Sequence, residues 1–118
     1  MDELLDRLVA KVGVDRAVAE KAVGIILAFL LKEGPSDKVQ ALINQMPGAE
    51  AATQAAASEE GFGMGGIMGV GTKLMAAGLG MEQMQGVTRE IIAYARDKAG
   101  EDAVGEIVGS IPGLGQFV

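Results

Sequence analysis

Residues 22–31, Ala-Val-Gly-Ile-Ile-Leu-Ala-Phe-Leu-Leu, are the longest strongly apolar run of the chain. A helix that spans a bilayer needs about 20 apolar residues, and this run has ten. The run therefore predicts a buried core helix. Asp15 is a suitable N-cap for this helix, and Gly34 followed by Pro35 marks its end.

Four further segments carry apolar residues at the spacing of one helical face. The segments are 4–12, 36–46, 84–99 and 104–111. Gly13 follows the first segment, where a left-handed C-cap fits, and a Pro-Gly pair follows the second and the last. The chain is therefore predicted to be all-α.

The size and composition of the chain indicate one domain with an aliphatic core. The chain has 118 residues, of which 49% are hydrophobic and 3% aromatic. A chain of this length supports one core, which aliphatic side chains and Met would fill. The residues that we expect in this core are Leu8, Ile26, Phe29, Leu42, Ile43, Met46, Ile91, Tyr94, Ile107, Val108 and Ile111.

The two ends of the chain superimpose without a gap when residue 26 is placed on residue 91 and every other residue is shifted by the same number. This repeat shift places Ile26-Leu27-Ala28-Phe29 on Ile91-Ile92-Ala93-Tyr94, Asp37 on Asp102, Val39 on Val104, and Met46-Pro47-Gly48 on Ile111-Pro112-Gly113. Unrelated amphipathic helices would share the apolar spacing, but they have no reason to share the Asp before it and the Pro-Gly after it. We therefore predict two tandem helical units whose uncovered faces pack together and close one core.

This interpretation divides residues 1–118 into the parts of a single all-α domain. The parts are a first unit at 1–48, a connector at 49–72, a second unit at 73–113 and a tail at 114–118. At 49–60 the sequence is Ala-rich and has no large apolar residue to bury. That composition predicts a solvent-facing helix or a mobile linker.

Each unit shows the same pattern: a long apolar helix, a break with an Asp, and an amphipathic helix that ends in Pro-Gly. With its Gly-, Leu- and Met-rich middle segment, the chain resembles the VcgC/VcgE-like family of small bacterial proteins and related duplicated helical domains of unknown function. The resemblance covers 8–48 and 61–112. It implies a repeated helical architecture and supplies no activity and no catalytic residue.

Residues 61–80 combine eight glycines with large apolar side chains. The motif Gly-x-Gly-x-x-Gly at 61–66 matches the fingerprint of dinucleotide-binding sites, which follows a β-strand. No β-strand is predicted before it here, so a dinucleotide-binding site is rejected. Gly61, Gly65 and Gly69 recur every four residues, and on a helix this spacing forms a smooth groove for a second backbone. A flexible linker and insertion into a membrane are the other interpretations of this segment.

Methionines are concentrated in the same region, with five of them between Met64 and Met84. Met is unbranched and polarisable, so it either fills gaps in a core or forms an adaptable surface for a partner. Our candidate interaction surface combines methionines with the glycine series: Gly61, Met64, Gly65, Met68, Gly69, Met75, Met81 and Met84.

The charges and the missing residue types exclude many functions. Ten Lys and Arg against sixteen Asp and Glu give a net charge of −6, which repels nucleic acid. With no His and no Cys, the chain lacks the commonest general base, the thiolate nucleophile and the usual zinc ligands. Glu101, Asp102 and Glu106 fit acids at a helix start better than a catalytic pair or a calcium loop. We expect no enzyme activity, no cofactor and no metal.

These observations favour a non-enzymatic helical interaction or scaffold module that binds a protein partner or itself. The N-terminus is acidic where an export signal would be basic, and the chain has no disulfide, which together favour a cytoplasmic location. The alternative is a lipid- or membrane-associated protein that docks through 61–81. The lack of a Lys/Arg-rich polar face disfavours this alternative.

Overall fold

The computed structural model describes residues 2–46, 48–57 and 66–111, and within these ranges it contains seven α-helices and no strand. The helices are α1 (Asp2–Val12), α2 (Arg16–Glu33), α3 (Ser36–Asn44), α4 (Ala49–Ala57), α5 (Gly66–Ala76), α6 (Met81–Ala99) and α7 (Glu101–Ser110). The all-α prediction is confirmed for this part of the chain.

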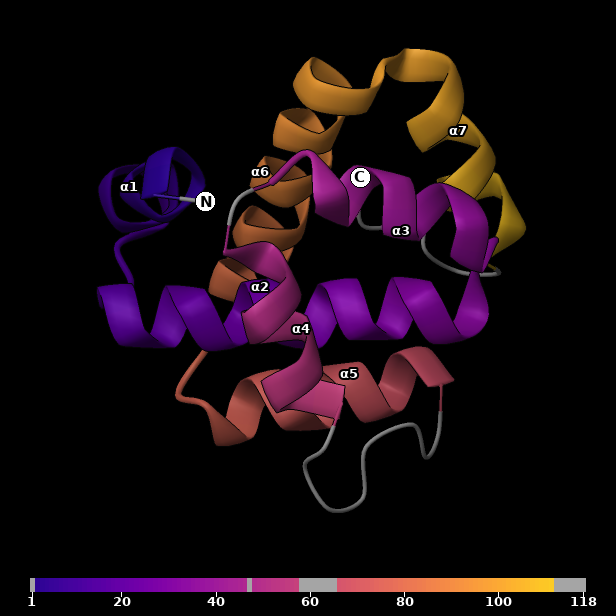
Figure 1. The fold of residues 1–118 in the computed structure, drawn as a ribbon. Helices are drawn as coiled ribbons and strands as arrows, with labels where there is room; N and C mark the ends of the chain where they lie inside the picture. The colour runs from indigo at the N-terminus through magenta and orange to yellow at the C-terminus, as the bar shows by residue number, and fades with distance from the viewer. Residues whose placement is uncertain (1, 47, 58–65, 112–118) are drawn as a thin grey trace.

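Helix α2 lies at the centre of the fold. In Figure 1 it runs across the middle of the molecule, with α3 along one side and α5 along the other. It packs against α1, α3, α4, α5 and α6, and every residue from Ala22 to Leu30 is buried. A helix that is apolar on all sides needs this complete cover. The apolar run at 22–31 is thus the buried core helix that the sequence predicts, with Leu31 partly buried at its end.

Helix α4 packs on α2 by direct contact between backbones. An ideal Cβ atom on Gly24 would lie only 2.3 Å from the carbonyl oxygen of Ala52 in α4. On the same helix Ala49 and Thr53 are buried, and the Thr53 hydroxyl donates a hydrogen bond to the Ala49 carbonyl at 2.7 Å. Small residues allow this approach, since larger side chains would hold the two helices apart.

Of the two interpretations of 49–60, the structure contains the helix, but this helix does not face solvent on all sides. Residues 49–57 form a helix with one face buried on α2, and 58–60 lie outside the described residues. The predicted connector at 49–72 also contains the start of α5 at Gly66. A buried face made of Ala and Thr has no large apolar residue, so the usual sequence signal of burial is missing.

The close approach of α2 and α4 gives a prediction for Gly24→Ala. The new Cβ would meet the Ala52 backbone, which has no flexible side chain to move, so we expect a loss of about 1–3 kcal/mol in the free energy of unfolding. Urea unfolding followed by circular dichroism measures this loss.

Gly105→Ala is the matched control, because Gly105 lies in α7 with nothing within 4 Å of its ideal Cβ. Ala at this position should raise the stability by about 0.4–1 kcal/mol. Equal unfolding midpoints for Gly24→Ala and the unchanged protein would contradict the backbone contact.

Two helices before α4 and two helices after it begin at positions that the repeat shift relates. Helices α2 and α6 begin at Arg16 and Met81, and α3 and α7 begin at Ser36 and Glu101, with the same separation in each pair. The packing is reciprocal: α1 lies against α6, and α5 lies against α2. The first helix of each half of the chain therefore covers the long helix of the other half.

The core contains the residues that the sequence predicts, with one exception. Ten of the eleven expected core residues are buried. The exception is Val108 of α7, which is partly buried and packs against the margin of the core. Ile43, which the repeat shift places on Val108, is 2% exposed.

This difference predicts unequal losses for Ile43→Ala and Val108→Ala. Ile43→Ala empties a fully buried site and should cost about 2–4 kcal/mol, whereas Val108→Ala removes fewer buried atoms and should cost about 1 kcal/mol or less. Thermal and urea unfolding of both variants measure the difference. Unchanged stability in both would show that these apolar faces do not contribute to the core.

Candidate interaction surface

The corner between α5 and α6 holds the part of the candidate surface that the structure describes. Helix α5 ends in a Schellman motif, in which the Leu79 N–H donates to the Leu74 carbonyl at 3.1 Å and the Gly78 N–H donates to the Met75 carbonyl at 3.0 Å. Gly78 has a φ of +106°, a conformation that side-chain-bearing residues rarely adopt. The motif buries both Leu74 and Leu79, which fixes the direction of the turn.

Two methionines point out of this corner. Met75 follows the buried Leu74 by one residue and is 58% exposed, and Met81, the first residue of α6, is 71% exposed. The start of α6 is held by the Gln83 side chain, which accepts a hydrogen bond from the Gly80 N–H at 3.0 Å. Both exposed methionines are therefore carried by ordered backbone.

The remaining predicted surface residues are distributed differently. Met84 is 8% exposed and belongs to the core, so its place in an interaction surface is corrected. Gly69 is partly buried in α5, and Met68 lies in the same helix, but its side chain is outside the described part. Gly61, Met64 and Gly65 lie outside the described residues.

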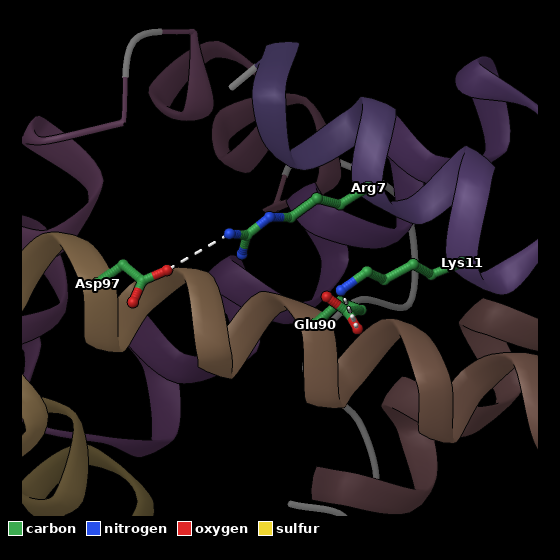
Figure 2. A network of polar contacts seen from close by, with 4 residues as sticks. All are labelled: Arg7, Lys11, Glu90 and Asp97. Atoms are coloured by element: carbon green, nitrogen blue, oxygen red, sulfur yellow. Dashed lines mark hydrogen bonds and ion pairs between the residues drawn. The ribbon is translucent and has the colours of Figure 1, made fainter.

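A second group of side chains, not expected from the sequence, joins α1 to α6. Figure 2 shows Arg7 and Lys11 of α1 reaching toward Asp97 and Glu90 of α6. The Arg7 Nη2 atom lies 3.5 Å from the Asp97 Oδ2 atom, and the Lys11 Nζ atom lies 3.8 Å from the Glu90 Oε1 atom. Arg7 also lies over the ring of the buried Tyr94, with 5.7 Å from its Cζ atom to the ring centre. These contacts link two positions of α1 to two positions of α6 in opposite chain order.

A weak sequence signal for this network exists. Arg7 and Lys11 are four residues apart, and Glu90 and Asp97 are seven apart, so each pair lies on one side of its helix. That spacing is equally typical of a charged face exposed to solvent. Local spacing does not indicate which helix is the partner, because the contact joins residues far apart in the sequence.

The acidic groups near the start of α7 are surface charges. Glu101, Asp102 and Glu106 are exposed, and Glu106 forms an ion pair with Lys38 of α3. In the described ranges, no group of three or more His, Cys, Asp or Glu side chains is placed to hold a metal ion. The ion pair links α3 to α7, so Glu106 has a structural partner in the fold.

Comparisons with protein families, with curated proteins and with solved structures found no match for this chain. Among the helices that the structure describes, none is both long and apolar enough to cross a membrane.

The network between α1 and α6 predicts small and unequal effects. Lys11→Gln removes one ion pair, in which Lys11 is exposed and Glu90 is partly buried, and should cost about 0.5 kcal/mol or less. Arg7→Gln also removes the packing of the guanidinium on Tyr94 and should cost about 0.5–1 kcal/mol. Urea unfolding at low and at high salt measures both losses, and high salt should abolish the Lys11 effect because it screens exposed charges. A larger loss for Lys11→Gln than for Arg7→Gln would contradict this assignment.

Proposed function

We propose that this chain is a non-enzymatic helical interaction or scaffold module of the cytoplasm, which binds a protein partner or a second copy of itself. The observation that carries the proposal is the exposure of Met75 and Met81 on either side of one ordered corner. In the described part of the chain, only three large hydrophobic side chains are exposed, and two of them are these methionines. Exposed methionines are typical of adaptable binding surfaces.

The chemistry of Met suits this role. Its side chain is flexible and polarisable, so it adapts to partners of different shape. The backbone of the corner is fixed by Gly78 and by the start of α6, so the flexibility is confined to the side chains. Lys73 and Glu82 lie close by in sequence, and these charges would form the polar rim that such interfaces usually have.

The proposal includes an origin of the fold in two related units. Supporting it, Gly13 and Gly78 are related by the repeat shift and both have a positive φ, and each follows the first helix of its half. Leu42 and Ile107, related by the same shift, are both 1% exposed. A duplicated unit would repeat its chain turns and its buried positions together.

The proposal predicts that Met75→Gln with Met81→Gln removes partner binding and leaves the fold unchanged. Gln keeps the length of the side chain and a good helix propensity while it replaces the apolar group. Val9→Gln is the matched control, because Val9 is also exposed, at 41%, but lies on α1. Self-association by sedimentation velocity, and quantitative capture of partners from the native host, are the two measurements.

The double variant should weaken binding by roughly tenfold or more, since burying two methionines contributes more than the roughly 1.4 kcal/mol that a factor of ten requires. Val9→Gln should bind as the unchanged protein does. Identical binding by the double variant and the unchanged protein would overturn the assignment of this corner.

Docking to lipid through 61–81 is the other proposal that exposed methionines support. Co-sedimentation with neutral phosphatidylcholine vesicles distinguishes lipid docking from protein binding, because a surface that binds protein does not need lipid. Vesicle binding that the Met75→Gln, Met81→Gln variant loses would replace the protein-binding proposal by lipid association.

A further inference from the structure

Helix α1 has one buried apolar face and is joined to α2 by a short connection. Its leucines Leu4, Leu5 and Leu8 are 3% exposed or less, and α6 and α2 are the helices that α1 packs against most closely. Figure 1 shows α1 at one end of the molecule, beside α6 and joined to the first turn of α2. Residues 13–15 form the whole connection.

The site on α6 fits α1 in shape and in charge. An ideal Cβ on Gly86 would lie 3.2 Å from the Cγ2 atom of Val12, so the missing side chain at Gly86 is what lets α1 approach. Glu90 lies opposite Lys11 farther along the same interface. Any helix that takes this site has to match the small residue and the charge, and α1 of a second copy matches both.

This connection contains Gly13, whose backbone can adopt two conformations that send the chain in different directions. We call the chain closed when α1 lies on its own α6. In this closed form Gly13 has a φ of +82°, and nothing lies within 4 Å of its ideal Cβ. Glycine adopts extended conformations as readily as this one, so the turn can open without a steric cost at Gly13. An opened turn would carry α1 away from its own α6.

We propose that two copies of this chain exchange α1, so that α1 of each copy lies on α6 of the other. The inference goes beyond the proposed function, because it uses the contact of α1 with α6 rather than the corner that holds Met75 and Met81. The contacts of α1 with α6 are the same in the closed form and in the exchanged dimer, so the equilibrium depends on the turn at 13–15 and on protein concentration. The chain already uses this arrangement between its own halves, where α5 covers α2 and α1 covers α6.

A pair of single-cysteine variants tests the exchange. The chain has no Cys, and the ideal Cβ of Gly86 lies 3.9 Å from the Cβ of Val12, a suitable separation for a disulfide, which needs about 3.5–4.5 Å. Val12→Cys on one copy and Gly86→Cys on another can form this bond only when α1 of the first lies on α6 of the second. The two variants, carrying tags of different mass, are mixed at high concentration, oxidised mildly and separated on a non-reducing gel.

The mixed disulfide should be the main cross-linked product, well above the disulfide dimers that each variant forms alone. Adding Gly13→Ala to both variants should raise the proportion of exchanged dimer by more than roughly five-fold, because a Cβ disfavours the left-handed conformation of the closed turn in each of the two copies. Gly105→Ala, at an open position with no positive φ, should leave this proportion unchanged. Equal dimer fractions with and without Gly13→Ala would overturn the role of the turn.

The double variant Val12→Cys, Gly86→Cys in dilute solution is the geometric control, and it should form a disulfide within one chain. If this bond forms and the mixed disulfide does not, the exchange is wrong. If sedimentation velocity shows dimers in that case, self-association and the proposed function would still be supported, and only the exchange of α1 would be wrong. If the bond fails to form within one chain, the contact between α1 and α6 is wrong, and the exchange falls with it.

Discussion

The burial of α2 on every side is the constraint on which the other helices depend. Because its residues from Ala22 to Leu30 are all covered, α2 needs neighbours around its whole circumference. Helices α1, α3 and α6 supply part of this cover, and α4 and α5 complete it. The neighbour α4 reaches α2 only because Gly24 has no side chain, so one missing Cβ determines how a whole helix is placed. The reciprocal packing of α1 on α6 then closes the second long helix.

Local patterns predicted the helices and most of the core, because these depend on residues near in sequence. Gly13 and Gly34 mark helix ends as expected, and the apolar positions at helical spacing are buried. The packing of α4 was not predictable in the same way, since a contact between Gly24 and the Ala52 backbone involves no large apolar residue. The charged residues of α1 and α6 likewise give no indication of which helices pair, because that pairing joins residues far apart in the chain.

The candidate surface was predicted in part, and the limits have a physical cause. Composition alone identifies a Met-rich region, but it does not separate methionines that fill the core from those that face solvent. Met84 lies on the apolar face of α6 with Val87 and is buried, whereas Met81 begins the same helix and is exposed. The direction of Met75 depends on the Schellman turn, which buries the preceding residue, Leu74.

The position of Tyr94 gives the protein an internal optical probe. The chain has one Tyr and no Trp, so its near-ultraviolet emission comes almost entirely from one side chain. That side chain is 3% exposed and lies beneath Arg7, at the contact of α1 with α6. Departure of α1 would remove this cation and admit water to the ring. Tyrosine emission therefore reports on the docking of α1 without any label, and separates it from the loss of helix that circular dichroism follows.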